Sequence, residues 1–321
     1  MTFQTLVVNN AGARLAYLDS GPPLSHRINY KTLFAVHGIV FSAPIFQRVM
    51  DLATQSGLRI VAINRSDYPG SSPLSAEDIG LISRSDAERV SYFRKGGLEL
   101  VHFIDMFIRV NKLPEISEDG ETGGVALLGW SLGNSFTLSG ITHASELADD
   151  AKDRLSKHLR SVAPVINPPS IGLGMPLPAR NWLPYMEDSI PFKDRIPLTT
   201  QWLTNYIDHS DISKRDDIYN MHSHIPYIAF PDALAGSDGL LMKNLSSQLS
   251  ANYHKACYRK EIRSLFPHMK VWEVTGDMTG SFAVVCYWQI QDDDDAHGGE
   301  NFNVQWDKPE RTIEAYLLAV A

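Results

Sequence analysis

The sequence predicts an α/β protein with a mostly parallel central sheet covered by helices on both faces. Short apolar runs rich in branched residues alternate along the chain with helix-compatible segments. Runs that are apolar throughout are typical of parallel strands buried on both faces. One such run, residues 125–128, ends on Gly-Trp-Ser-Leu-Gly and passes at once into a helical segment. In sheets of this kind the binding site lies beyond the carboxyl ends of the strands.

The first part of the chain supplies a hairpin, two strands and a helix. Residues 6–8 and 15–18 flank a turn and predict an antiparallel hairpin. Residues 32–36 form a continuous apolar strand. Residues 44–57 carry apolar side chains at helical spacing and end on glycine, which commonly closes a helix. Residues 58–63 predict the next buried strand.

The middle of the chain continues the alternation. Residues 85–110 predict a long amphipathic helix with one apolar face. It leads to the strand that carries the serine motif, and a helix follows from residue 134. A charged helix over residues 146–158 and a strand over residues 161–166 come next. One parallel sheet accounts for this order of elements.

Composition changes after residue 169. Residues 170–265 hold many prolines and aromatics and show no clear strand and helix alternation. We interpret this segment as an inserted helical lid, the cap. The core domain then comprises residues 1–169 and 266–321.

The sheet resumes after the cap. Residues 269–276 predict a strand, and a helix follows over residues 281–289. The acidic stretch 292–300 reads as a solvated loop. It lacks the ligand spacing of a calcium or zinc site, so no metal is expected. The last helix is predicted to begin at Pro309, a favoured first-turn residue.

Composition also limits the partners. The chain has 321 residues, a formal net charge of -8 and no basic run, whereas nucleic-acid binding relies on clustered lysine and arginine. Its two cysteines, Cys257 and Cys286, fit a reducing compartment. The N-terminus lacks signal-peptide features, and no apolar run approaches the ~20 residues that span a bilayer. We expect a cytoplasmic protein without cofactor, membrane partner or nucleic-acid partner.

The motif Gly129-Trp130-Ser131-Leu132-Gly133 has the G-x-S-x-G pattern of a nucleophile elbow. In an elbow a strand turns so sharply into a helix that only glycine tolerates the close approach on either side of the serine. The turn lifts the serine hydroxyl out of the sheet, beside the positive end of the following helix. We therefore predict Ser131 as the reactive residue.

The order of these parts resembles the α/β-hydrolase superfamily over nearly the whole chain. The loop at His37 is similar to the oxyanion loop of that superfamily. Residues 64–72 are similar to its turn after the next strand, and residues 129–133 are similar to its nucleophile elbow. Together with residues 306–310, these segments are also similar to a group of fungal α/β-hydrolase-like proteins. The resemblance implies the α/β-hydrolase fold with an inserted helical lid.

The resemblance also implies a nucleophile, an oxyanion hole, a base and an acid. Ser131 would be the nucleophile, and the backbone N–H groups of Leu132 and Ile39 would bind the oxyanion. Removing one such donor typically costs ~10²–10³ in rate. His37 is expected to be structural in its loop or to line the substrate pocket.

The base is where the sequence departs from the fungal relatives. They place the catalytic histidine shortly before a Trp-Asp pair. With Trp306-Asp307 as the anchor, Phe302 occupies that position, and phenylalanine cannot accept a proton. His297, on the preceding glycine-flanked loop, is the replacement base that the sequence offers.

The acid departs from the family pattern as well. Asp277 lies two residues before the usual place, and the alternative place after the sixth strand holds Asn167. Loss of the histidine from a serine hydrolase costs on the order of 10⁶ in turnover. Either the base comes from elsewhere, or the reaction is not hydrolysis.

Three functions follow. The favoured one is an enzyme that acts on a small apolar carbonyl-containing metabolite by non-hydrolytic chemistry (cyclisation, isomerisation or elimination), with Ser131 and the oxyanion hole polarising the carbonyl. The second is a serine esterase or lactonase with Ser131, His297 and Asp277. The third is a non-catalytic ligand-binding protein, and a homodimer is left open. The expected pocket residues are polar or aromatic: His37, Trp130, Asn167, Trp182, Tyr185, Trp202, Tyr206 and Phe302.

Overall fold

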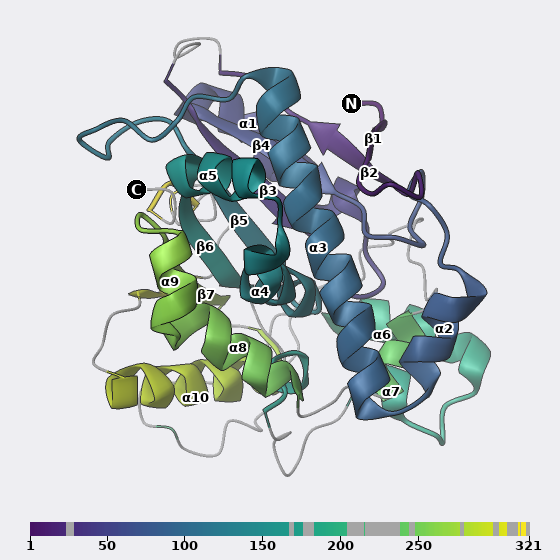
Figure 1. Cartoon of the computed structure of the whole chain (residues 1–321). Coiled ribbons are helices and arrows are strands. Elements are labelled where there is room, and N and C mark those ends of the chain that lie inside the picture. The colour runs from purple at the N-terminus through teal and green to yellow at the C-terminus, as the bar shows by residue number, and fades with distance from the viewer. Residues whose placement is uncertain are drawn as a thin grey trace.

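The computed structural model contains one sheet, which among the described residues has 8 strands in the order β1-β2-β4-β3-β5-β6-β7-β8 (Figure 1). β1 pairs with β2 and β2 with β4 antiparallel, and the other neighbours are parallel. The predicted hairpin and mostly parallel sheet are confirmed. The strands are β1 (Gln4–Val7), β2 (Arg14–Asp19), β3 (Lys31–Val36), β4 (Leu58–Ile63), β5 (Val125–Trp130), β6 (Leu159–Ile166), β7 (Lys270–Gly276) and β8 (Phe302–Trp306).

The structure describes residues 1–23, 29–166, 170–175, 183–203, 215, 238–243, 248–276, 279–297, 302–306, 314 and 316–318.

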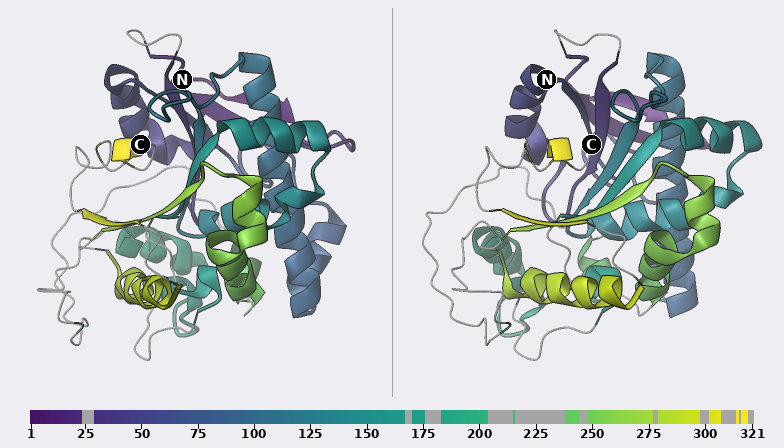
Figure 2. Two further views of the ribbon diagram at one scale, coloured as in Figure 1. Left: turned by 60° about the vertical axis from the view of Figure 1, so that its left-hand side comes forward. Right: turned by 90° about the vertical axis from the view of Figure 1, so that its left-hand side faces the viewer.

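Helices cover both faces of the sheet, as predicted. Figure 2 shows α1 on one face and α3, α4, α5, α8 and α9 on the other. No helix among the described residues is both long and apolar enough to cross a bilayer. The helices are α1 (Gln47–Ala53), α2 (Ala76–Ser83), α3 (Asp86–Asn111), α4 (Gly133–His143), α5 (Asp149–His158), α6 (Phe192–Leu203), α7 (Asp238–Lys243), α8 (Gln248–Tyr258), α9 (Lys260–Leu265) and α10 (Ser281–His297), with the 3₁₀ turns η1 (Ala43–Phe46), η2 (Thr54–Ser56), η3 (Ala144–Glu146), η4 (Ser170–Leu173) and η5 (Pro184–Met186).

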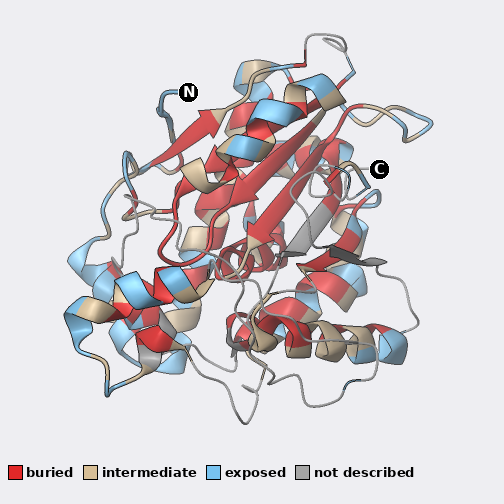
Figure 3. Ribbon diagram, turned by 180° about the vertical axis from the view of Figure 1, so that it is seen from behind, coloured by how far each residue is buried: buried red, intermediate tan, exposed pale blue. Residues whose placement is uncertain are grey.

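Apolar residues are buried on both faces of the sheet. Figure 3 shows the strands and the sides of the helices that face them in red, the colour of buried residues. Along β3, Leu33 and Ala35 belong to the core on the α1 face, and Phe34 and Val36 belong to the core on the α3 face. Successive side chains of a strand point to opposite faces, so a strand covered on both sides must be apolar at every position. This requirement explains the uninterrupted apolar runs in the sequence.

Capping residues set the start of the two helices that follow β4. Ser85 and Glu88 form a reciprocal capping box at the predicted start of α3. Ser75 and Asp78 form the same box at the start of α2, a helix that the apolar periodicity does not predict. The Ser-x-x-Asp spacing is the signal that identifies α2, because it satisfies two backbone donors at once.

The C-terminal part differs from the prediction in two places. α10 continues to His297, so the loop predicted from Asp292 is wrong. The acidic run therefore continues the helix. Within it, Asp292 and Asp295 are exposed and Asp294 is buried. The backbone of Phe302–Trp306 forms β8, an edge strand for which the sequence carries no prediction.

The predicted start of the last helix, Pro309, lies outside the described residues. Residues 316–318 are helical, and Tyr316 packs into the core on the α1 face.

The segment interpreted as the cap lies between neighbouring strands, since β6 and β7 pair directly. Its described residues form helices and no strand. α8, however, packs against α4: Thr142 donates to the carbonyl oxygen of Asn252 at 3.0 Å, and Leu249 and Tyr253 are buried in the core. This packing favours a cap that ends before α8, while both domain boundaries remain predictions.

Candidate active site

The serine motif lies at the carboxyl end of β5, where the strand passes into α4. Ser131 has a φ of 53°, in the left-handed region that is strained for a residue other than glycine. A methyl group on Gly129 would lie 2.7 Å from the backbone nitrogen of Asn134, and one on Gly133 would lie 2.4 Å from the carbonyl oxygen of Val36. The close approach of α4 and β3 therefore requires both glycines, and the predicted strand–turn–helix geometry is confirmed.

The loop after β3 lies directly against Ser131. A methyl group on Gly38 would be 2.8 Å from the Cβ and 3.3 Å from the Oγ of Ser131. Val40 has a φ of 57°, a strained conformation for a branched residue. Within the described part of the chain, neither the N–H of Ile39 nor that of Leu132 has an acceptor. Unpaired N–H groups beside a serine hydroxyl are the components of an oxyanion hole.

His37 is buried, and both of its ring nitrogens bond to the backbone. Its Nδ1–H donates to the carbonyl oxygen of Gly38 at 2.8 Å, and its Nε2 accepts from the N–H of Arg65 at 3.2 Å. Burial, and then the Arg65 charge, lower the pKa of His37 well below its ordinary value. A neutral imidazole with both nitrogens occupied has no lone pair for a reacting group, so His37 has the structural role.

A buried ion pair, which the sequence did not reveal, lies next to this loop. Arg65 follows β4, and its Nη1 and Nη2 donate to the two carboxylate oxygens of Asp238 at 2.9 and 2.6 Å. Nη2 also donates to the carbonyl oxygen of Gly38 at 3.1 Å. The hydroxyl of Tyr68 donates to the same carboxylate. Asp238 stands 173 residues from Arg65, so only the tertiary structure shows that the two charges meet.

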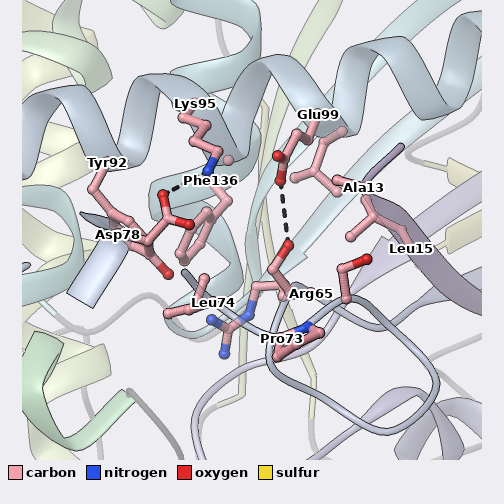
Figure 4. Close-up of a pocket in the computed structure, with 14 residues that line it drawn as sticks. Ala13, Leu15, Arg65, Pro73, Leu74, Asp78, Tyr92, Lys95, Glu99 and Phe136 are labelled. Carbon is pink, nitrogen blue, oxygen red and sulfur yellow. Dashed lines mark hydrogen bonds and ion pairs between the residues drawn. The ribbon is translucent and has the colours of Figure 1, made fainter. Parts of the chain in front are cut away.

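A hollow of about 50 Å³ lies beside Arg65 between α2, α3 and the turn after β4 (Figure 4). Within it Lys95 pairs with Asp78 at 2.6 Å, and Glu99 accepts from Ser66 at 3.3 Å. Burial raises the pKa of Glu99. Ser131 does not line this hollow, so it is separate from the elbow.

Solved structures share the fold over nearly the whole chain. A bromoperoxidase from Bacillus anthracis gives a TM-score of 0.51 at 13% identity and covers 99% of both chains. A carboxylesterase structure from the thaumarchaeon Nitrososphaera gargenis gives 0.51 at 11% identity and covers 99% of this chain and 98% of the other. The N-acyl homoserine lactonase AidH, complexed with N-butanoyl homoserine, gives 0.55 at 12% identity and covers 99% and 95%.

The chain has the α/β-hydrolase fold. No protein-family model and no curated protein matches the sequence. At identities this low, the structural likeness shows the fold alone, and function in an α/β-hydrolase fold has to be argued from the site.

The structure describes the side chains of three of the predicted pocket aromatics, Trp130, Tyr185 and Trp202. Trp130 is half-buried, with its ring 5.3 Å from that of Phe41. Tyr185 is buried, and a methyl group on Gly239 of α7 would meet its hydroxyl at 1.8 Å. The ring of Trp202 on α6 lies 5.5 Å from that of Phe282. Tyr185 therefore packs inside the cap. Asn167, Trp182, Tyr206 and Asp277 lie outside the described residues.

Phe302 is not in a loop that follows a strand. Phe302 is the first residue of β8, and its backbone pairs with that of Trp272. Val304, by contrast, pairs with Val274, which pairs with Ile166 and hence with Trp130. Phe302 therefore lies two residues before Val304, the residue of β8 that is level with Trp130 across the sheet. Sites in this fold lie beyond the carboxyl ends of the strands, so the backbone pairing does not favour Phe302 at the histidine position, and that placement stays a prediction.

His297 contacts α8. It is the last residue of α10, its Nδ1–H donates to the carbonyl oxygen of Asp293 at 2.6 Å, and its ring stacks on Tyr258 with the centroids 4.1 Å apart. The prediction that His297 lies on a loop is wrong, because His297 is the last residue of helix α10; its role as the base of Ser131 stays a prediction. The hydroxyl of Ser131 makes no hydrogen bond to any residue that the structure describes.

Histidines 26, 209, 222 and 224 lie outside the described residues. Among the described residues, no three His, Cys, Asp or Glu side chains are grouped so that they could hold a metal ion.

Proposed function

We propose that the chain is an enzyme that polarises the carbonyl group of a small apolar metabolite and converts it by non-hydrolytic chemistry, namely cyclisation, isomerisation or elimination. Ser131 donates one hydrogen bond to the carbonyl oxygen, and the N–H groups of Ile39 and Leu132 donate the others. The observation that carries the proposal is the strained elbow beside two N–H groups that have no acceptor among the described residues. Donors aimed at developing negative charge are usually the largest single contribution to catalysis.

The histidines support a reaction that needs no acyl-enzyme. His37 has both nitrogens bonded to the backbone, and His297 stacks on α8. The hydroxyl of Ser131 makes no hydrogen bond to any histidine that the structure describes. A serine hydrolase without its base keeps only the ~10³–10⁴ over water that the oxyanion hole and binding provide. Selection for ester hydrolysis would not preserve such a site.

The surroundings of the elbow favour a neutral, apolar substrate. Ile39 and Leu132 are buried apolar residues, and Trp130 and Phe41 lie together beside them. Arg65, whose guanidinium donates to the Gly38 carbonyl of the neighbouring loop, is neutralised by Asp238. Apolar walls with a few fixed polar groups are typical of small-molecule sites. The carboxylesterase and the lactonase among the similar structures act, by their names, on carbonyl compounds, which supports a carbonyl substrate here.

A serine esterase or lactonase with Ser131, His297 and Asp277 is the alternative. It requires His297 to leave its stack on Tyr258 and to act at Ser131 in another conformation. A non-catalytic ligand-binding protein is the third candidate. It leaves the strain at Ser131 and Val40 without a use, although strain of this kind costs of order 1–3 kcal/mol per residue.

Product analysis in heavy-oxygen water tests the proposal. The protein is incubated with a panel of aryl esters, lactones and β-keto compounds, and the products are analysed by mass spectrometry. We expect a product without oxygen from water, formed by the wild type and by Ser91→Ala, which removes an exposed hydroxyl on α3, but not by Ser131→Ala.

Two other results would replace the proposal. Incorporation of heavy oxygen, with fluorophosphonate labelling of Ser131 that disappears in His297→Ala, would establish the hydrolase. Ligand binding that survives Ser131→Ala, with no conversion and no labelling, would establish the non-catalytic protein.

A further inference from the structure

The loop that supplies the Ile39 donor is held at one atom, the carbonyl oxygen of Gly38. This oxygen accepts from Nδ1–H of His37 at 2.8 Å and from Nη2 of Arg65 at 3.1 Å. In a trans peptide the N–H points opposite to the C=O, and the described residues contain no cis peptide bond. Fixing the Gly38 carbonyl therefore fixes the direction of the Ile39 N–H.

Asp238 in turn holds the donor Arg65. Nη2 of Arg65 has two hydrogens, and its two shortest bonds go to Asp238 at 2.6 Å and to Gly38 at 3.1 Å. The Asp238 carboxylate thus sets the plane of the guanidinium, and the second Nη2 hydrogen is left pointing at Gly38. The bidentate geometry is specific to arginine, since a lysine ammonium is a point charge.

Tyr68 connects His37, the second group that donates to the Gly38 carbonyl, to the same carboxylate of Asp238. Its hydroxyl donates to Asp238, and its ring lies 4.2 Å from the ring of His37. Both groups that hold the Gly38 carbonyl are therefore backed by Asp238, one through a charge and one through ring contact.

Asp238 belongs to the segment that the sequence assigns to the cap. It is the first residue of α7, which packs against α2 and η5. The exposed fractions of the Arg65 and Asp238 side chains are 4% and 2%. A buried arginine without its counterion is strongly unfavourable, so removal of α7 would turn Arg65 toward water and release Gly38.

We propose that Arg65 is a positioning residue that transmits the docking of α7 to the oxyanion loop, so that the Ile39 donor is aimed at the Ser131 site only while Asp238 is in place. This inference rests on the proposed function for the identity of the oxyanion site. It adds a link between the cap and that site, through residues that touch no reacting atom.

The chain contains a matched control for this cluster. At the amino end of β4, Arg59 donates to Asp19 at 2.9 Å, to the hydroxyl of Tyr30 at 3.1 Å and to the side-chain oxygen of Asn111 at 2.9 Å, and it lies over the ring of Phe107. Arg65 likewise has an aspartate and a tyrosine hydroxyl as partners and lies over the ring of Phe136, but its further acceptor is the carbonyl oxygen of Gly38. Arg59→Met therefore breaks an equivalent buried pair far from the elbow.

The test separates stability from loop position. Arg65→Met and Asp238→Leu each leave one buried charge without a partner, and each should lower the midpoint of thermal unfolding. The triple variant Arg65→Met, Tyr68→Phe, Asp238→Leu replaces the whole cluster by apolar groups of similar size, which in other proteins restores stability. We expect its midpoint to recover toward the wild type.

Two measurements then report on the loop. One is amide hydrogen exchange of the peptide over residues 37–43. The other is the affinity for benzeneboronic acid, followed by boron NMR of the tetrahedral adduct with Ser131, with Ser131→Ala as the specificity control. In the triple variant we expect faster exchange and about a 10-fold weaker adduct, despite the restored midpoint. Arg59→Met should lower the midpoint and leave both loop measurements unchanged.

Recovery of the midpoint together with wild-type exchange and affinity would overturn the inference, because the cluster would then be structural alone. If the triple variant does not fold, Asp238→Asn keeps the shape and removes the charge. It should accelerate exchange of the same peptide, and unchanged exchange would again overturn the inference. Failure of the wild type to form the adduct would count against the proposed oxyanion site, while the exchange data would still decide the role of Arg65.

Discussion

Gly38→Ala is the most direct test of the geometry around Ser131. The added methyl group would lie 2.8 Å from the Cβ of Ser131 and 3.1 Å from the carbonyl oxygen of Trp130. Ordinary contact begins at 3.4 Å, so the loop and the elbow have to separate by about 0.6 Å, the difference between 3.4 and 2.8 Å. Neither side yields easily, because Ser131 is fixed by the strained elbow and Gly38 by Arg65 and His37.

The expected effect is large on binding and moderate on stability. A misplacement of ~1 Å costs on the order of 10² in rate, and loss of one oxyanion donor costs ~10²–10³. We therefore expect the affinity of Gly38→Ala for benzeneboronic acid to fall by about 10². Overpacking of a tight contact costs ~1–3 kcal/mol, so a domain of ordinary stability remains folded.

The measurement compares boronate affinity and urea unfolding for Gly38→Ala and Gly80→Ala. Gly80 lies on α2, and a methyl group there would have its nearest contact, the side chain of Arg84, at 3.5 Å. Gly80→Ala should keep the affinity and gain ~0.5–1 kcal/mol of stability, because alanine favours a helix. Wild-type affinity in a folded Gly38→Ala protein would refute the placement of the loop against Ser131.

Three further predictions concern stability. Burial lowers the pKa of His37, so below the ordinary pKa of ~6.5 the unfolded chain binds a proton at this residue and the folded chain does not. The free energy of unfolding should therefore fall as pH drops below ~6.5, by up to ~1.4 kcal/mol per pH unit. In His37→Asn, the free energy of unfolding measured with urea should depend less steeply on pH. Burial raises the pKa of Glu273 well above its ordinary value, so the folded form keeps a proton that the unfolded form loses above pH ~4.3. Glu273→Gln should therefore become more stable relative to the wild type as pH rises from acid to alkaline. Parallel curves of unfolding free energy against pH for the two proteins would contradict this. Ser85→Ala removes the capping hydroxyl of α3 and should cost ~1 kcal/mol in urea unfolding, with Ser91→Ala as the uncapped control.

Local pattern predicted most of the fold. The strand runs that were assigned from apolar composition coincide with β3, β4 and β5, because a strand covered on both faces has to be apolar throughout. The elbow could be located from five residues, since the glycines are required by contacts within a few residues or with the neighbouring strand. The acidic end of α10 was missed because a helix exposed on one side can be polar there, and only packing against α8 shows the helix.

The site divides in the same way. Ser131 and the two proposed N–H donors could be predicted from one short motif and one loop of the sequence. The state of the histidines was decided by the tertiary structure, which bonds both nitrogens of His37 to the backbone and stacks His297 on Tyr258. The pairing of Arg65 with Asp238 was also decided there, across 173 residues. Sequence spacing encodes interactions between neighbours along the chain, whereas an ion pair or a hydrogen bond between distant segments forms only when the burial of the whole core brings them together.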